Sequence, residues 1–181
     1  MDITTPLTSE IIENLKIGDM ITLTGEIYTA RDSAHKRLCE TISQGDKLPI
    51  DIDGCIIYYV GPTDAKDGEV IGSCGPTTSY RMDAYCPLLM DLGLKAMIGK
   101  GERNQEVINS ICKNKCVYLG AYGGLGALIS SHVVKSEIIC YEDLGTEAIR
   151  KLTVNKLPLV VIIDSKGNNL YKTGQNKFKE I

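Results

Sequence analysis

The chain has 181 residues, with 20 Lys and Arg against 23 Asp and Glu and a formal net charge of −3. This slightly acidic balance, without a basic run or a patch of interleaved aromatic and basic residues, argues against nucleic acid as a partner. A chain of this length, with one Phe, nine Tyr and no Trp, is expected to fold as a single domain over residues 1–181 around Ile, Leu and Val.

Neither the first residues nor any later stretch predicts an association with a membrane. The sequence starts without the basic and apolar segments of a signal peptide. No apolar run approaches the length of a membrane span. We therefore expect a cytoplasmic protein.

Seven cysteines are scattered along the chain: Cys39, Cys55, Cys74, Cys86, Cys112, Cys116 and Cys140. Only Cys112 and Cys116 are close, and no second pair or nearby His completes a metal-ligand set. In a cytoplasmic chain most should be reduced, buried and apolar. Cys74 is a candidate nucleophile because of its position, although no motif links His35 or His132 to it as a base.

The first third of the chain predicts a helix over 7–15, a strand over 20–28 and a helix over 34–42 that Asp32 or Ser33 can cap. Apolar and polar residues alternate clearly in that strand, as in a strand buried on one face.

Three basic residues crowd the junction of this strand with the second helix: Arg31, His35 and Lys36. Cations near a helix N-terminus are electrostatically disfavoured, so a chain that keeps them there can be using them on an anion. A solvated basic helix start is the alternative. For His35 we expect support or packing rather than catalysis.

The stretch 75–85 is the predicted centre of the chemistry, after a strand over 55–60. Beyond Gly75 and Pro76, the hydroxyl residues Thr77, Thr78 and Ser79 can each cap a helix. A helix start gathers free N–H groups at a positive dipole end, which suits a carboxylate or phosphate. Arg81, four residues after Thr77, would project from the same face. The alternative is a capped helix with an ordinary surface Arg.

The rest of the chain continues the alternation of helices and strands. We expect a helix over 83–92, kinked at Pro87 and ended by Gly93, and a buried strand over 95–99 that places Lys100 at its end. The Gly-rich turn at 123–126 fails the dinucleotide fingerprint and indicates close packing. The remaining expectations are helices over 106–113, 127–132 and 145–152, strands over 116–119, 137–141 and 157–164, a hairpin closed by 169–171, and a loose polar tail over 172–181.

This pattern predicts an α/β domain with a partly parallel, mixed sheet of six or seven strands and four or five helices. Arg31, Arg81 and Lys100 all follow strand ends or helix starts. If they converge beside Thr77, they would suit a substrate with two carboxylates, because bidentate Arg pairing fixes orientation as well as charge.

Three ordered segments closely resemble the β subunit of the two-subunit class I fumarate hydratases, and the related tartrate dehydratase β subunit shares the pattern. They are Tyr28-Thr29-Ala30-Arg31-Asp32-Ser33-Ala34-His35-Lys36-Arg37, Gly75-Pro76-Thr77-Thr78-Ser79-Tyr80-Arg81-Met82-Asp83 and Ile98-Gly99-Lys100-Gly101. The resemblance covers essentially the whole chain, in order. In single-chain members this unit is the C-terminal domain.

The resemblance implies a swivelling β/β/α domain and a hydro-lyase that hydrates fumarate to (S)-malate. It implies a 4Fe–4S cluster whose three cysteine ligands belong to a partner α subunit, so that no metal ligand is expected here. By the same resemblance, Arg31, Arg81 and Lys100 bind the dicarboxylate and Thr77 acts on the base side with an acidic residue of the partner. His35, Thr78 and Asp83 are supporting residues, and the assembly is a heterotetramer or a homodimer of heterodimers.

Three alternatives stay open from the sequence. The substrate could be L-tartrate, dehydrated to oxaloacetate, because both substrates are four-carbon dicarboxylates with the same charged ends. The same cations could serve a non-catalytic, anion-binding regulatory module. Cys74 could carry an acyl-transfer reaction.

Overall fold

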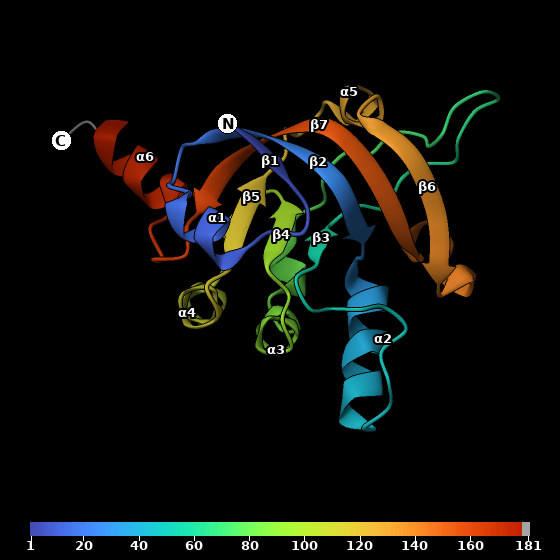
Figure 1. Cartoon of the computed structure of the whole chain (residues 1–181), viewed down its shortest axis with the longest axis horizontal. Coiled ribbons are helices and arrows are strands. Elements are labelled where there is room, and N and C mark those ends of the chain that lie inside the picture. Colours follow the sequence, from blue (N-terminus) through green and yellow to red (C-terminus); the bar gives the residue numbers. More distant parts are fainter. Residues whose placement is uncertain (179–181) are drawn as a thin grey trace.

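Seven strands form one mixed sheet in the computed structural model, which describes residues 1–178. In chain order they are β1 (Asp2–Thr4), β2 (Met20–Thr29), β3 (Ile56–Tyr58), β4 (Ala96–Gly99), β5 (Val117–Gly120), β6 (Val133–Cys140) and β7 (Ile149–Ile163). Their order is β1-β2-β3-β4-β5-β7-β6, and β2 also pairs with β7. This additional pairing closes β2, β3, β4, β5 and β7 into a five-stranded barrel (Figure 1).

The strands β2 to β5 are parallel, whereas β7 runs antiparallel to β2, β5 and β6. The expected α/β class with a mixed sheet is therefore confirmed. Parallel strands carry their carboxyl ends to the same edge of a sheet. One end of the barrel thus collects the residues that follow β2, β3, β4 and β5.

Helices cover the barrel mainly on one side. They are α1 (Ser9–Asn14), α2 (Asp32–Ser43), α3 (Cys86–Asp91), α4 (Gln105–Asn114), α5 (Gly126–Ser130) and α6 (Leu170–Phe178), with 3₁₀ turns η1 (Ser79–Met82) and η2 (Glu142–Glu147). Figure 1 shows α2, α3 and α4 along one face of β3, β4 and β5. Among residues 1–178, no helix combines the length and the apolarity needed to cross a bilayer.

Two apolar cores lie on the two faces of the sheet. Alternate residues of β2, such as Ile21, Leu23 and Ile27, point into the barrel. On the other face Met97 and Tyr118 pack against α2, α3 and α4. Because β3, β4 and β5 are buried on both faces, they form near-continuous apolar runs in the sequence.

The predicted helix over 145–152 is wrong. The chain leaves η2 at Glu147 and enters β7 at Ile149. In its first half β7 pairs with β2 on one side and β6 on the other. Two sets of ladder hydrogen bonds, together with the burial of alternate residues, outweigh the weak local preference for helix.

The predicted hairpin with 169–171 is also wrong, since only a single bridge joins Ile163 to Asn169. Helix α6 begins at Leu170, and the Asn169 side chain accepts a hydrogen bond from the Tyr171 N–H (3.0 Å). An Asn at this position stabilises a helix start. Residues 172–178 are therefore helical, not loose, and 179–181 of the predicted tail lie outside the described residues.

The predicted helix start at 77–79 is shorter than expected. The chain forms only the four-residue turn η1, whose N-cap position is Thr78, with no side-chain capping bond. Pro87 lies in the first turn of α3 rather than kinking a longer helix, because Pro has no N–H and is tolerated there. Gly93 follows α3 at φ 109°, as expected for a residue that ends a helix.

Candidate functional site

The loop that carries Thr77 is fastened to the carboxyl ends of two parallel strands. The Thr77 N–H donates to the Tyr59 carbonyl after β3 (2.8 Å). Thr78 forms a parallel bridge with Lys100 after β4, and the Ser79 N–H donates to the Lys100 carbonyl (2.9 Å). The sheet thus places Thr77 and Lys100 on the same edge of the barrel.

Arg31, Asp32, Thr77, Arg81 and Glu147 form a connected set, which we call the arginine network. Arg81 Nη2 donates to Thr77 Oγ1 (2.8 Å) and lies 3.4 Å from Asp32 Oδ2. Arg31 Nη2 lies 3.8 Å from that oxygen and 3.3 Å from Glu147 Oε1. The structure therefore brings Arg31, Arg81 and Thr77 together, which is part of the convergence that the sequence left as a condition.

Arg31 packs against Gly61, three residues after the end of β3. A Cβ added at Gly61 would lie 2.9 Å from Arg31 Nη1 and 3.1 Å from the Thr146 carbonyl oxygen. A side chain at this position would press on the guanidinium and on the Thr146 carbonyl, so glycine leaves the most room for Arg31. Arg31 Nε is buried without a hydrogen-bond partner among the described residues.

Lys100 is exposed, and its stem passes the Gly-rich turn, where a Cβ added at Gly123 would lie 3.8 Å from Lys100 Cδ. The backbone of this turn also packs closely, since a Cβ at Gly126 would lie 2.8 Å from the Gly75 nitrogen. The predicted tight turn with close packing is confirmed. Within residues 1–178, Lys100 has no ion-pair partner, so its charge is free for a ligand.

His35, in the first turn of α2, supports the backbone of Arg31. Its side chain is fully buried, and Nδ1 lies 2.8 Å from the Arg31 carbonyl oxygen. A carbonyl only accepts, so Nδ1 carries the proton. Burial lowers the pKa of His35 from 6.5 to about 4, which keeps the ring neutral near pH 7. A neutral ring whose Nδ1 proton is donated to the Arg31 carbonyl is suited to hold the backbone of Arg31 in place, which is the supporting role that we expected for His35.

Asp83 lies in a separate, buried ion pair. Its carboxylate accepts from Arg103 Nε (2.6 Å) and from the Asn104 N–H (2.7 Å). These bonds tie the end of η1 to the start of α4, and so fix the turn that carries Arg81. In the described part of the chain, Asp83 has no ion pair with Arg31 or Arg81.

Sequence reasoning missed Asp32, Glu147 and Arg103 as part of this arrangement. Asp32 was expected as a helix cap, but Arg31 occupies the N-cap position and the Asp32 carboxylate turns to the two arginines. Glu147, which also accepts from the Ser33 N–H (3.0 Å), comes from a segment with a wrong helix prediction. No spacing in the sequence links Glu147 or Arg103 to the site, and Asp32, although it follows Arg31 directly, was given only the capping role.

The cysteines do not fit a metal cluster. Across residues 1–178, no three side chains of His, Cys, Asp or Glu gather as a metal-ligand set. Cys74 is fully buried, its Sγ donates to the Gly72 carbonyl (3.3 Å), and burial raises its pKa to about 11. A buried thiol of this kind is a poor nucleophile, which argues against the acyl-transfer alternative.

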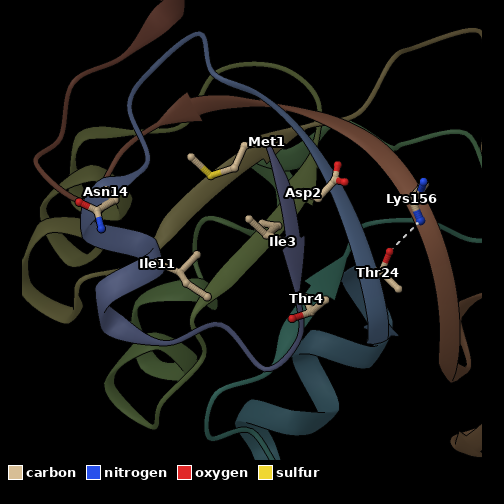
Figure 2. A pocket seen from close by; sticks show the side chains of 8 residues that line it. All are labelled: Met1, Asp2, Ile3, Thr4, Ile11, Asn14, Thr24 and Lys156. Carbon is tan, nitrogen blue, oxygen red and sulfur yellow. Dashed lines mark hydrogen bonds between the residues drawn. The ribbon is translucent and has the colours of Figure 1, made fainter.

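A cavity of about 320 Å³ lies elsewhere on the molecule (Figure 2). It is formed by β1, α1, β2 and Lys156 of β7, whose N–H donates to Thr24 Oγ1 (3.0 Å). None of the candidate residues lines it. The candidate site is instead at the open end of the barrel that collects the residues after β2 to β5, where Arg81 and Lys100 are exposed to solvent.

Residues 1–174 match the family model described as "Fumarase C-terminus". The chain belongs to the fumarase C-terminal family. It is 38% identical over 180 residues to a Methanocaldococcus jannaschii protein provisionally named L(+)-tartrate dehydratase subunit beta, with 96% of this chain and 92% of the relative covered. The fumarase C-terminal family includes larger relatives that carry the name fumarate hydratase.

The anaerobic class I fumarate hydratase of Escherichia coli is 38% identical over 182 residues, covering 98% of this chain but 33% of that enzyme. The mitochondrial fumarate hydratase of Leishmania major is 35% identical over 168 residues, covering 90% and 31%. The chain therefore spans about a third of these fumarate hydratases and nearly all of the tartrate dehydratase subunit. These names support a hydro-lyase family and leave the substrate unspecified.

Proposed function

We propose that this chain is the β subunit of a two-subunit hydro-lyase that reversibly hydrates fumarate to (S)-malate. The observation that carries this proposal is the contact of Arg81 with both Thr77 and the carboxylate shared with Arg31. Two guanidinium groups and a hydroxyl meet at the barrel edge where Lys100 also ends. Such a set matches a small dicarboxylate with a proton to be moved beside one carboxylate.

Arg31, Arg81 and Lys100 would bind and orient the two carboxylates. Removing a proton next to a carboxylate builds negative charge on that group, and cations that are already in place lower the barrier without rearranging. Only Nη2 of Arg81 has partners among the described residues. Its remaining N–H groups can grip a substrate carboxylate in a fixed plane.

Thr77 would act in the proton transfer. Its oxygen accepts a hydrogen bond from the Arg81 guanidinium, which stabilises negative charge on that oxygen. A Thr hydroxyl alone is a weak base, so a neighbouring base has to activate it. We assign that neighbour to an acidic residue of a partner subunit, because the two acidic groups of the arginine network, Asp32 and Glu147, are engaged with arginines.

The proposed partner is an α subunit, in a heterotetramer or homodimer of heterodimers. Support comes from the M. jannaschii relative, whose name denotes one subunit of an enzyme and whose length this chain nearly matches. The 4Fe–4S cluster expected from the resemblance is assigned to that partner, since the cysteines of this chain do not fit it. The swivelling β/β/α description belongs to the same proposal.

L-Tartrate dehydration to oxaloacetate is the second candidate, favoured by the name and coverage of the same relative. The charged ends of the two substrates are alike, so the arginine network suits both. A panel of fumarate, malate and tartrate with the reconstituted enzyme decides between them.

The proposal is tested by separating the chain from its partner under anaerobic conditions. The isolated chain should fold, stay colourless after treatment with iron and sulfide, and show no hydratase activity. Adding the cluster-bearing subunit should produce activity that oxygen destroys. An isolated chain that binds a cluster stoichiometrically, or that hydrates fumarate alone, would contradict the proposal.

Replacing Arg81 with Lys should lower kcat/KM of the reconstituted enzyme by roughly tenfold to a hundredfold, although the charge is kept. An ammonium group cannot reach Thr77 and a carboxylate in one plane. Steady-state kinetics measure the effect. The matched control is Arg37→Lys on α2, where the arginine pairs with Asp143 on the surface and wild-type kinetics are expected. Equal kinetics of both variants would make Arg81 an ordinary surface residue.

A further inference from the structure

We propose that Asp32 is a positioning residue of this site, which holds Arg81 beside Thr77 and weakens the binding of anions other than the substrate. The inference rests on the proposed function. It assigns a role to a carboxylate that the sequence suggested only as a helix cap. Asp32 acts through the two arginines and needs no contact with the substrate.

The first observation is the place of the Asp32 carboxylate between the two guanidinium groups. Its Oδ2 lies 3.4 Å from Arg81 Nη2 and 3.8 Å from Arg31 Nη2. Both distances exceed the 2.7–2.9 Å typical of tight pairs between a guanidinium and a carboxylate. Asp32 therefore brings the arginines together without saturating their donors, and a substrate carboxylate can still bind.

The second observation is that the two arginines depend on Asp32 unequally. Arg31 has another acidic partner in Glu147 (3.3 Å) and is packed against Gly61. Arg81 is more exposed, at 38% of its side chain, and Asp32 is its one acidic partner in the described part of the chain. Neutralising Asp32 would leave Arg81 without an acidic partner and close to the positive charge of Arg31, so Arg81 is the one able to move away from Thr77.

The net charge of the arginine network explains why Asp32 would also weaken the binding of anions other than the substrate. Arg31 and Arg81 contribute two positive charges, and Asp32 and Glu147 contribute two negative charges. The network is thus near neutrality. Lys100, which has no ion-pair partner among residues 1–178, adds an unpaired positive charge at the same end of the barrel. A small inorganic anion gains little from such a site, whereas a dicarboxylate that also reaches Lys100 gains more. Removing the Asp32 charge should make the network generally attractive to anions.

The test compares Asp32→Asn, Asp32→Glu and Asp46→Asn in the reconstituted two-subunit enzyme. Asp46 is an exposed acid in the loop after α2 and provides the matched loss of one charge. For Asp32→Asn we expect sulfate to inhibit about tenfold more strongly. We expect kcat to fall about tenfold, because Arg81 is less well placed, while KM does not rise. Asp32→Glu keeps the negative charge, so its sulfate inhibition and its kcat should both lie close to the wild-type values. Asp46→Asn should match the wild type.

Calorimetric titration of sulfate and of succinate, a dicarboxylate that does not react, measures binding separately from turnover. If the role of Asp32 were purely structural, Asp32→Asn would lower the melting temperature and the yield. The dissociation constant of sulfate and the kcat of the folded enzyme would then stay unchanged, and that result would overturn the inference. So would an Asp32→Asn enzyme with raised KM and normal kcat. If the wild-type enzyme neither binds succinate nor turns over fumarate or tartrate, the proposed function itself is wrong.

Discussion

Replacing Thr77 with Val should lower kcat of the reconstituted enzyme by about 10²- to 10⁴-fold, the usual cost of losing a group that acts in proton transfer. Val keeps the branched shape of Thr and removes the oxygen that accepts from Arg81 Nη2. The backbone bond from the Thr77 N–H to the Tyr59 carbonyl is retained, so the loop should keep its place. Stability should therefore change by only about 1 kcal/mol, the net value of one hydrogen bond.

Melting and steady-state kinetics on the same preparation distinguish the catalytic role from a structural one. Thr153→Val on β7 is a suitable control, since it makes the same change at a half-buried strand position away from the arginine network. Near-normal turnover of Thr77→Val would refute proton transfer by Thr77. It would favour the non-catalytic, anion-binding module that the sequence left open.

Acidification should destabilise this protein through His35. The folded state protonates His35 only near pH 4, because the ring is buried, whereas the unfolded chain does so near its ordinary pKa of 6.5. Between these values the unfolded state binds more protons, so stability is complete above about pH 6.5 and falls as the pH is lowered. At pH 5 the loss should be about 2 kcal/mol. Urea unfolding of the full chain at pH 7.5 and pH 5 measures it.

Two variants isolate this effect from the titration of carboxylates. In His35→Asn the side-chain amide can still donate to the Arg31 carbonyl, but it does not titrate, so the difference between the two pH values should shrink by about 2 kcal/mol. His132→Gln removes the other histidine, which is only half-buried, and should keep the wild-type difference. An unchanged pH dependence in His35→Asn would contradict the assignment.

Local patterns predicted much of the fold correctly. The alternation in 20–28, the apolar run that became β4 and the helix that became α2 each have a periodicity that one short segment carries by itself. The predictions failed where a distant segment decides the structure. Residues 145–152 became η2 and the start of β7 because β2 and β6 supply hydrogen-bonding partners on both sides.

The site shows the same division. The sequence by itself indicated that Arg31, Arg81 and Lys100 end at one edge of the sheet, since they follow strand ends or a turn, and parallel strands carry such positions to a common edge. It also predicted that Arg81 lies beside Thr77, four residues earlier, although the contact is made from the short turn η1 and not from a helix. Only the tertiary structure decided that Asp32 leaves the helix cap to join two arginines, that Glu147 reaches Arg31 from a segment more than a hundred residues away, and that Asp83 pairs with Arg103 instead of the site. An ion pair depends on the distance between two side chains in the folded protein. For residues far apart in the sequence, that distance is set when the barrel closes, and no local periodicity predicts it.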